Sequence, residues 1–542
     1  MEARRRHRIL RILKEYGVIQ FTILAIIFLV ADYFISIQIY ATAKNQWQTT
    51  LQDKAALLVD IGLIGFWLFL YGCFIRDKIY FTLTDGRKYT KDNARTGKDF
   101  FYLLHFYRHE AEEHKLNIKQ FPVATWREIK GLPLAQVGER CVCIPSTEQT
   151  NFTLTGAPGC GKTQTAEACA ITHEGSVVFV DVKGVSHLNK PGRNIKRFCP
   201  EDPDYKTESC HFNPLKGLES MTLSQKKLYL TEMANILIPD EPGSDGNFFP
   251  SRARKAFIGI VFLLLDVKPE GKTLTFPAVV HNILQNNIFG WINKVKESDC
   301  TEAKEQIAAF DQASEKNIAG VYDALCTALA PFSNEIFDYL LDDKGDQIGV
   351  EMLDNGADLY LQIKQEHLTA MAPIITMILN SLMRDFMNRP DSASGIKTRN
   401  ILVVLDEFPQ LTFSYDMANT YLSTLRSKNV QIMLVFQSIK QLKYKYRDGA
   451  EALIGNCNYQ LIFKCNDVES RTNYSKLIGT HQVLRVSDSA PNKNATEGHA
   501  SKNVSIVREP VFQPEDFGDL EDEVIIYFDG KYLRGKKIVT YK

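Results

Sequence analysis

Residues 156–163 read G-A-P-G-C-G-K-T, which fits the pattern G-x-x-x-x-G-K-[ST] at every fixed position. A short β-rich run at residues 152–155 precedes this motif, and residues 164–170 after it are typical of the start of a helix. A strand, a glycine-rich turn and a helix form the context in which this pattern cradles phosphates. The chain is therefore expected to contain an α/β sheet with a phosphate-binding loop between one strand and one helix.

The residues of this loop have separate parts in holding a nucleotide. Its glycines let backbone N–H groups converge on the phosphates, and the helix N-terminus adds a partial positive charge. Lys162 is expected to reach the β and γ phosphates, and the Thr163 hydroxyl to ligate Mg²⁺. ATP and Mg²⁺ are the expected cofactors. The predicted nucleotide-binding residues are Gly156, Ala157, Pro158, Gly159, Cys160, Gly161, Lys162, Thr163 and Gln164.

Two later apolar runs end in polar side chains that complete such a site. Residues 401–405 lead into Asp406 and Glu407, as in a Walker-B strand. Asp406 can hold Mg²⁺ through water, and Glu407 can polarise the attacking water. Residues 430–436 are a second run, and it ends at Gln437. This amide resembles the γ-phosphate sensor of RecA-like motors, although a polar cap on the strand is the alternative. Glu407 and Gln437 are accordingly predicted to be catalytic.

The remaining periodicity divides the soluble part of the chain into a sheet domain with an insertion. Residues 176–181 form a continuous apolar run, which indicates a parallel strand buried on both faces. Residues 222–345 are helical by period, and the sheet resumes at residues 359–363, followed by a helix at 371–387. The predicted domains are a nucleotide-binding domain in two parts, 79–221 and 346–542, with an inserted all-α domain at 222–345.

Charge and cysteine content indicate which partners the chain attracts and which redox compartment suits it. The 64 basic and 64 acidic residues give no overall electrostatic attraction to nucleic acid or to acidic membranes. The 11 cysteines are scattered, and one lies inside the phosphate loop, which indicates a reducing compartment. Cys141 and Cys143 could form a redox or metal pair, but alternate positions on one strand are the simpler interpretation.

Two apolar stretches near the N-terminus, residues 18–40 and 55–75, are each close to the length that a helix needs to cross a bilayer. Arginines and lysines precede the first stretch and follow the second, whereas the segment between them holds few. The positive-inside rule therefore predicts a two-span membrane anchor at residues 1–78, with both termini and the bulk of the chain in the cytoplasm.

Taken together, these motifs resemble those of type IV coupling proteins of the TraD/TrwB/TraG group. Residues 181–184 resemble the D-x-K-G segment of that family, residues 212–215 its F-N-P-L segment, and residues 248–254 its F-W-x-x-x-A-R element. Residues 405–409 and 435–442 resemble D-E-[FL]-P and V-x-Q-S-x-x-Q-L. Two N-terminal spans complete the similarity, which covers nearly the whole chain.

The resemblance implies an ATPase of the bacterial inner membrane that assembles as a ring, usually a hexamer. Such a protein recruits relaxase-bound DNA, expected to be single-stranded, or a protein substrate, and drives it into a type IV secretion channel during conjugation. Arg426 matches the family position of an arginine that a neighbouring subunit supplies to the transition state, although it could equally be a surface residue. Residues 440–447 interleave cations and aromatics as DNA-tracking surfaces do, but a solvated helix is the simpler interpretation.

Two other functions stay open on the sequence. The chain could be an ATP-dependent receptor for secreted proteins that never translocates DNA. It could also be a DNA translocase of the FtsK or HerA kind, although the F-N-P-L and A-R elements and the all-α insertion favour the coupling group. An ABC-type ATPase is disfavoured because the chain has no LSGGQ-like segment.

Overall fold

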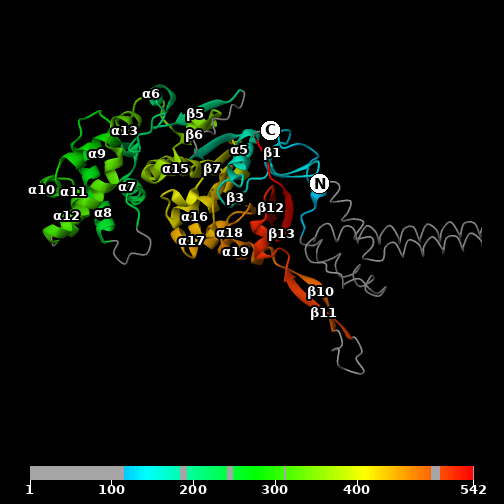
Figure 1. Ribbon diagram of the computed structural model, residues 1–542. Coiled ribbons are helices and arrows are strands. Elements are labelled where there is room, and N and C mark those ends of the chain that lie inside the picture. Colours follow the sequence, from blue (N-terminus) through cyan, green and yellow to red (C-terminus); the bar gives the residue numbers. More distant parts are fainter. Residues whose placement is uncertain (1–114, 183–191, 241–247, 311–312, 490–500, 541–542) are drawn as a thin grey trace, which may run out of the picture. The chain divides into compact units, whose positions relative to one another are not determined.

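The computed structural model describes residues 115–182, 192–240, 248–310, 313–489 and 501–540 (Figure 1). The predicted spans at 18–40 and 55–75 lie outside these residues. Over the ranges described, no helix combines the length and apolarity that a membrane crossing requires. The chain divides into two compact units, and the larger one comprises residues 115–479 and 511–542.

The larger unit is built on one mixed sheet of 11 strands in the order β2-β1-β13-β12-β9-β3-β8-β7-β4-β6-β5. The seven strands from β9 to β5 pair in parallel, and the four from β2 to β12 pair antiparallel to their neighbours. The strands are β1 Gly131–Val137, β2 Arg140–Pro145, β3 Phe152–Thr155, β4 Ser176–Asp181, β5 Asn194–Phe198, β6 Ala357–Gln362, β7 Ile401–Leu405, β8 Val430–Phe436, β9 Tyr459–Ile462, β12 Glu523–Phe528 and β13 Lys531–Lys536.

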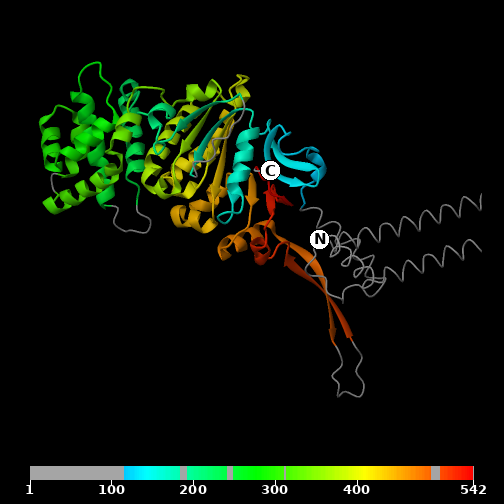
Figure 2. The same ribbon diagram turned by 45° about the horizontal axis from the view of Figure 1, so that its top comes forward.

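Alternation along the central strands gives the sheet two apolar faces with separate cores. On β4, Val178 and Val180 join one core, while Val177 and Phe179 join the other. The first core includes side chains of α15 (Leu368–Met387), and the second includes side chains of α5 (Lys162–Thr172). Figures 1 and 2 show the sheet between these helices. Because both faces are buried, the central strands are mostly apolar, which is why the sequence revealed them.

Between β5 and β6, the described residues contribute helices and no further strand to the fold. The longest of these helices, α8, packs against α7, α11 and α12. In Figure 1 this helical group lies at one end of the larger unit. The helices are α6 Tyr205–Glu208, α7 Leu223–Leu237, α8 Phe248–Val267, α9 Phe276–Gln285, α10 Ile288–Glu297, α11 Thr301–Ile307, α12 Glu315–Leu329, α13 Glu335–Leu340 and α14 Val350–Asp354.

Four further helices, α16 to α19, follow the Walker-B strand in sequence, and α19 is followed by a hairpin that belongs to the other unit. The helices are α16 Tyr415–Thr424, α17 Ile439–Tyr446, α18 Gly449–Gly455 and α19 Val468–Ile478. The hairpin strands β10 (Thr480–Ser489) and β11 (Ser501–Pro510) pair antiparallel over their whole length. The sequence did not predict this hairpin.

The strand interpretation of the cysteine pair is confirmed. Cys141 and Cys143 both lie on β2, two residues apart, and both are buried. Burial raises the pKa of each thiol. In the described part of the chain, no group of three or more His, Cys, Asp and Glu side chains could hold a metal ion.

Candidate nucleotide-binding site

The glycine-rich loop begins where β3 ends, and the ends of β8 and β9 hold it there. Gly156 N donates to Phe436 O at 3.4 Å, and Ala157 N donates to Lys464 O at 2.7 Å. Because β3 lies between β8 and β9 in the sheet, these bonds fix the start of the loop from both sides. The loop then passes into α5 at Lys162, so the predicted order of strand, loop and helix is confirmed.

Each of the three glycines in the loop lies where a residue with a side chain would clash or be strained. A Cβ atom on Gly156 would lie 2.6 Å from Phe463 Cβ and 2.9 Å from Cys160 Sγ, too close for any side chain. Gly159 and Gly161 have φ angles of 74° and 104°, in the left-handed region that glycine adopts most easily. The loop conformation therefore depends on the glycines of the motif.

Lys162 is the first residue of α5, and its side chain turns back over the loop. It is only 7% exposed, and its Nζ donates to Gly156 O at 2.6 Å and to Ala157 O at 3.1 Å. A phosphate group would offer this ammonium a stronger, charge-assisted partner than a neutral carbonyl. Thr163 and Gln164 follow in the first turn of the helix, and Pro158 and Gly159 form the exposed tip of the loop.

Glu407 lies directly after β7 in an unusual backbone conformation. Its φ is 52°, a left-handed value that is uncommon for a residue other than glycine and costs free energy. The side chain is 8% exposed, and its Oε1 accepts a hydrogen bond of 2.9 Å from Gln437 Nε2. Its Oε2 is buried and accepts no hydrogen bond from any of the described residues. One carboxylate oxygen is thus held in place, while the other is buried and keeps its capacity to accept a hydrogen bond.

The parallel register brings these groups to the same edge of the sheet as the loop. Thr155 of β3 lies opposite Phe436 of β8, and Leu405 of β7 lies opposite Leu434 of β8. Since adjacent strands are about 4.8 Å apart, the ends of β3 and β7 are separated by roughly 10 Å. The predicted nucleotide-binding loop, the Walker-B carboxylates and Gln437 therefore gather at one place.

The side chains present suit Mg²⁺ bound together with a nucleotide. Asp406 is 3% exposed, and its Oδ1 accepts a hydrogen bond of 3.1 Å from Glu407 N. Mg²⁺ usually takes one or two protein ligands and completes its shell with phosphate oxygens and water. The Thr163 hydroxyl and the Asp406 carboxylate are oxygen donors of the kind it prefers, and the buried Oε2 of Glu407 is a further oxygen without a hydrogen-bond partner among the described residues.

Arg426 does not lie with these residues. It is exposed, in the short 3-10 helix η8 (Leu425–Lys428) that precedes β8. The loop Gly156–Thr163 follows the carboxyl end of β3, whereas η8 lies at the amino end of the parallel strand β8, the opposite edge of the sheet. Arg426 thus cannot serve the site of its own subunit, and its predicted role requires a neighbouring subunit.

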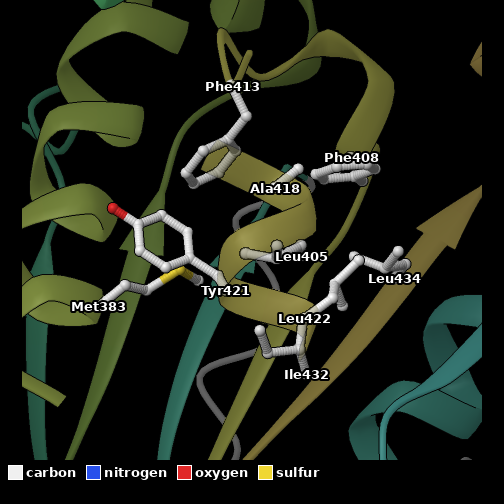
Figure 3. Close-up of a pocket in the computed structure, with 9 residues that line it drawn as sticks. All are labelled: Met383, Leu405, Phe408, Phe413, Ala418, Tyr421, Leu422, Ile432 and Leu434. Carbon is white, nitrogen blue, oxygen red and sulfur yellow. The ribbon is translucent and has the colours of Figure 1, made fainter. Parts of the chain in front are cut away.

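An apolar pocket lies behind the Walker-B strand, on the face covered by α15 and α16 (Figure 3). The Tyr421 hydroxyl at its edge is bonded to Asn380 Oδ1. The lining offers a nucleotide no charged group, so the candidate site remains at the glycine-rich loop. The lining residues are Met383, Leu405, Phe408, Phe413, Ala418, Tyr421, Leu422, Ile432 and Leu434.

Lys537 is a neighbour of the loop that the sequence did not identify. It follows β13, and its Nζ donates to Cys160 O at 3.4 Å and to Glu521 O at 2.6 Å. Three residues later, Thr540 Oγ1 donates to Glu167 Oε2 on α5 at 3.3 Å. The segment after β13 therefore braces the loop and its helix from outside. Because 377 positions separate Lys537 from Cys160, no local pattern could have revealed the contact.

Lys537→Met should weaken nucleotide binding by about threefold to tenfold, since each hydrogen bond to a loop carbonyl contributes roughly 0.5–1.5 kcal/mol. Titration of the full-length protein with a fluorescent ATP analogue measures the change. The exposed neighbour Lys536→Met is the matched control and should bind as the wild type does. Equal affinities for the two variants would show that Lys537 does not support the loop.

The fold and the site together define a RecA-like α/β protein of the P-loop class. The model of the family described as Type IV secretory system Conjugative DNA transfer matches residues 123–542. The chain therefore belongs to this family, and the resemblance to type IV coupling proteins is confirmed.

Among individual proteins, two conjugal transfer proteins TraG of Escherichia coli are similar to parts of the chain. One is 23% identical over 171 residues, which are 30% of this chain and 27% of that protein. The other is 23% identical over 211 residues, which are 35% of this chain and 33% of that protein. Both matches thus span about a third or less of the relatives' own length.

Solved structures of the coupling protein TrwB share the fold over most of the chain. The unbound monoclinic form of TrwBdeltaN70 has a TM-score of 0.58 at 15% identity and covers 76% of this chain and 89% of that one. TrwB in complex with ADP and Mg²⁺ has a TM-score of 0.57 at 16% identity and covers the same shares. At these identities the likeness establishes the RecA-like fold.

Proposed function

We propose that this protein is an ATP-hydrolysing coupling protein that recruits relaxase-bound DNA and drives it into a type IV secretion channel during conjugation. The observation that carries the hydrolysis part is the hydrogen bond between Gln437 and Glu407 beside the glycine-rich loop. This bond leaves the other carboxylate oxygen of Glu407 without a partner among the residues described, so its lone pairs could accept a proton from a water molecule that enters with the nucleotide. Membership of the conjugative transfer family supports the DNA part.

Each group of the site would have one task in hydrolysis. Lys162 and the N–H groups at the start of α5 would hold the β and γ phosphates and offset their charge. Thr163 and Asp406 would hold Mg²⁺, which supplies further charge neutralisation when bound. Glu407 would accept the proton of a water molecule as the water oxygen attacks the γ phosphorus and the bond to ADP breaks. Gln437 would keep the Glu407 carboxylate oriented toward that water.

The proposal extends to the organisation of the chain. Residues 1–78 would anchor it in the cytoplasmic membrane by spans at 18–40 and 55–75, with both termini in the cytoplasm. Residues 79–221 and 346–542 would form the nucleotide-binding domain around an all-α domain at 222–345. A homo-hexameric ring would bring Arg426 of one subunit to the nucleotide of the next, which is consistent with its exposed place at the opposite sheet edge.

ATP turnover by the full-length protein in detergent should rise several-fold when single-stranded DNA is added, because a translocase couples its cycle to its track. Phosphate release is measured with single-stranded DNA, double-stranded DNA and no DNA, beside Lys162→Ala as a blank. Turnover that no DNA changes would instead favour a receptor for secreted proteins. Stimulation by double-stranded DNA alone would favour a translocase of the FtsK or HerA kind.

A further inference from the structure

Helix α17 follows Gln437 in the chain, and its far end packs against the segment that follows Glu407. Its N-cap, Ser438, immediately follows Gln437, and Gln441 Oε1 on the helix accepts a hydrogen bond of 3.2 Å from Gln437 N. Gln437 in turn bonds Glu407. The first turn of α17 therefore fixes the backbone from which the Gln437 side chain reaches the Glu407 carboxylate.

The last turn of the same helix holds the segment that follows Glu407. Lys445 Nζ donates to Pro409 O at 3.1 Å and also to Leu411 O. The Tyr446 ring stacks on the Phe408 ring with centroids 5.7 Å apart, and its hydroxyl donates to Phe413 O at 3.3 Å. The segment 408–413 thus receives contacts from α17 at several successive points.

This arrangement divides the basic and aromatic residues of the stretch 440–447 between internal contacts and the outer surface. Lys445 and Tyr446 face the Glu407 loop, and Lys443 forms ion pairs with Glu451 at 3.2 Å and Glu469 at 3.3 Å. Lys440, Tyr444 and Arg447 remain exposed. The expectation that the stretch is a solvated helix fits part of it, but the sequence did not indicate the inward role of Lys445.

The position of Lys445 has an electrostatic cost. Burial lowers the pKa of its ammonium to about 7, since few water molecules solvate the charge. The charged and titratable side chains on the elements packed against α17 are engaged elsewhere or exposed: Glu451 and Glu469 bind Lys443, Arg471 Nε donates to Cys465 O, and Lys476 is exposed. Glu407 itself accepts from Gln437. The two hydrogen bonds that Lys445 donates to backbone carbonyls hold its ammonium in this place and tie those carbonyls to α17.

We propose that Lys445 is a positioning residue for ATP hydrolysis, because it ties the segment 409–411 to α17 and so keeps Glu407 in its left-handed conformation with its carboxylate on Gln437. This role rests on the proposed function of the site. Lys445 touches no group of the candidate nucleotide site itself, so it acts through the backbone of the loop. Its loss should lower kcat and leave nucleotide affinity nearly unchanged.

The test compares Lys445→Met, which keeps the apolar stem, with Lys445→Arg, which keeps a permanent positive charge, in the full-length protein. Lys440→Met, on the exposed side of the same helix, is the matched control. We expect Lys445→Met to lower kcat about tenfold with the dissociation constant for ATP within about twofold, as loss of two modest hydrogen bonds implies. Lys445→Arg should restore most of that loss, and Lys440→Met should behave as the wild type.

The pH profile separates positioning from simple stabilisation. As pH rises through about 7, Lys445 loses its proton, and its bonds to the carbonyls lose their charge assistance. The kcat of the wild type should therefore fall across that range, whereas Lys445→Arg should keep its rate because its guanidinium stays charged. Identical pH profiles and equal kcat for all variants would overturn the proposal.

Hydrogen exchange provides a readout that does not depend on activity. The amides of residues 406–413 should exchange faster in Lys445→Met than in Lys440→Met, in the absence of nucleotide. If the wild type hydrolyses no ATP, the proposed function fails, and exchange alone then decides whether Lys445 holds the loop. Unchanged exchange would overturn the positioning role, whether or not Lys445→Met is active.

Discussion

Lys162→Ala should abolish ATP hydrolysis and DNA transfer together. Lys162 is 7% exposed, and its ammonium is already directed into the glycine-rich loop by the carbonyls of Gly156 and Ala157. A buried phosphate that loses this charge-assisted partner loses stabilisation both in the ground state and as charge shifts toward the leaving group. We expect kcat to fall by about 100-fold or more, as for loss of other electrostatic donors. Phosphate release and mating frequency from a complemented deletion strain measure the two effects.

The controls separate the charge of Lys162 from its geometry. Lys162→Arg keeps the charge but presents a planar fork where a compact ammonium fits, so it should remain strongly impaired. Lys130→Ala removes an exposed lysine before β1 and should transfer DNA normally. Normal transfer by Lys162→Ala would contradict the proposal that hydrolysis at this site drives transfer.

Five parallel strands, β3, β4, β6, β7 and β8, could be predicted from the sequence because they are buried on both faces. The partly exposed edge strand β5 and the short strand β9 were not predicted. Strands β4 and β7 are largely apolar runs; Asp181 is the last residue of β4 and Asp406 follows β7, both at the edge where the loops gather. The same logic located Asp406, Glu407 and Gln437. In the structure, the strand order β3-β8-β7 brings the ends of these neighbouring parallel strands, and so these residues, close together.

The antiparallel half had no comparable signal. Strands β12 and β13 come from the C-terminal part of the chain, yet they lie between β9 and β1, whose sequences are far away. Their neighbours are set by long-range pairing, which local periodicity does not encode. The contact of Lys537 with Cys160 could not be predicted for the same reason, because it forms only when β13 pairs in the sheet.

The sequence pattern also did not indicate the strained backbone of Glu407. The motif placed a glutamate after the Walker-B strand, but not its φ of 52° nor the helix that holds the following segment. Such conformations persist where surrounding contacts determine them, here the bonds from Gln437 and Lys445. The sequence therefore proposed the residues of the candidate site, of which Arg426 lies apart from the others, while the contacts that orient them required the fold.

Glu407→Gln should bind ATP nearly as the wild type does and hydrolyse it at least about 100-fold more slowly. Glutamine has the size of glutamate and can still accept the hydrogen bond from Gln437 Nε2, so the loop should keep its conformation. It cannot accept a proton from water, and its amide nitrogen would occupy the place of the buried Oε2. Nucleotide titration and single-turnover hydrolysis in the full-length protein distinguish binding from chemistry. Glu366→Gln, at an exposed glutamate before α15, is the control.

An unchanged rate in Glu407→Gln would move the base to another carboxylate, and the sheet offers one. Asp181 ends β4, the strand beside β7, and is 1% exposed. It is less suited to the task, because its Oδ2 accepts a hydrogen bond of 3.2 Å from Gln362, whose own Oε1 accepts one of 2.6 Å from Arg197. Oε2 of Glu407, by contrast, has no hydrogen-bond partner among the described residues. If Glu407→Gln hydrolyses ATP normally and Asp181→Asn does not, Asp181 is the base; if only Glu407→Gln is slow, the strained glutamate performs the proton transfer.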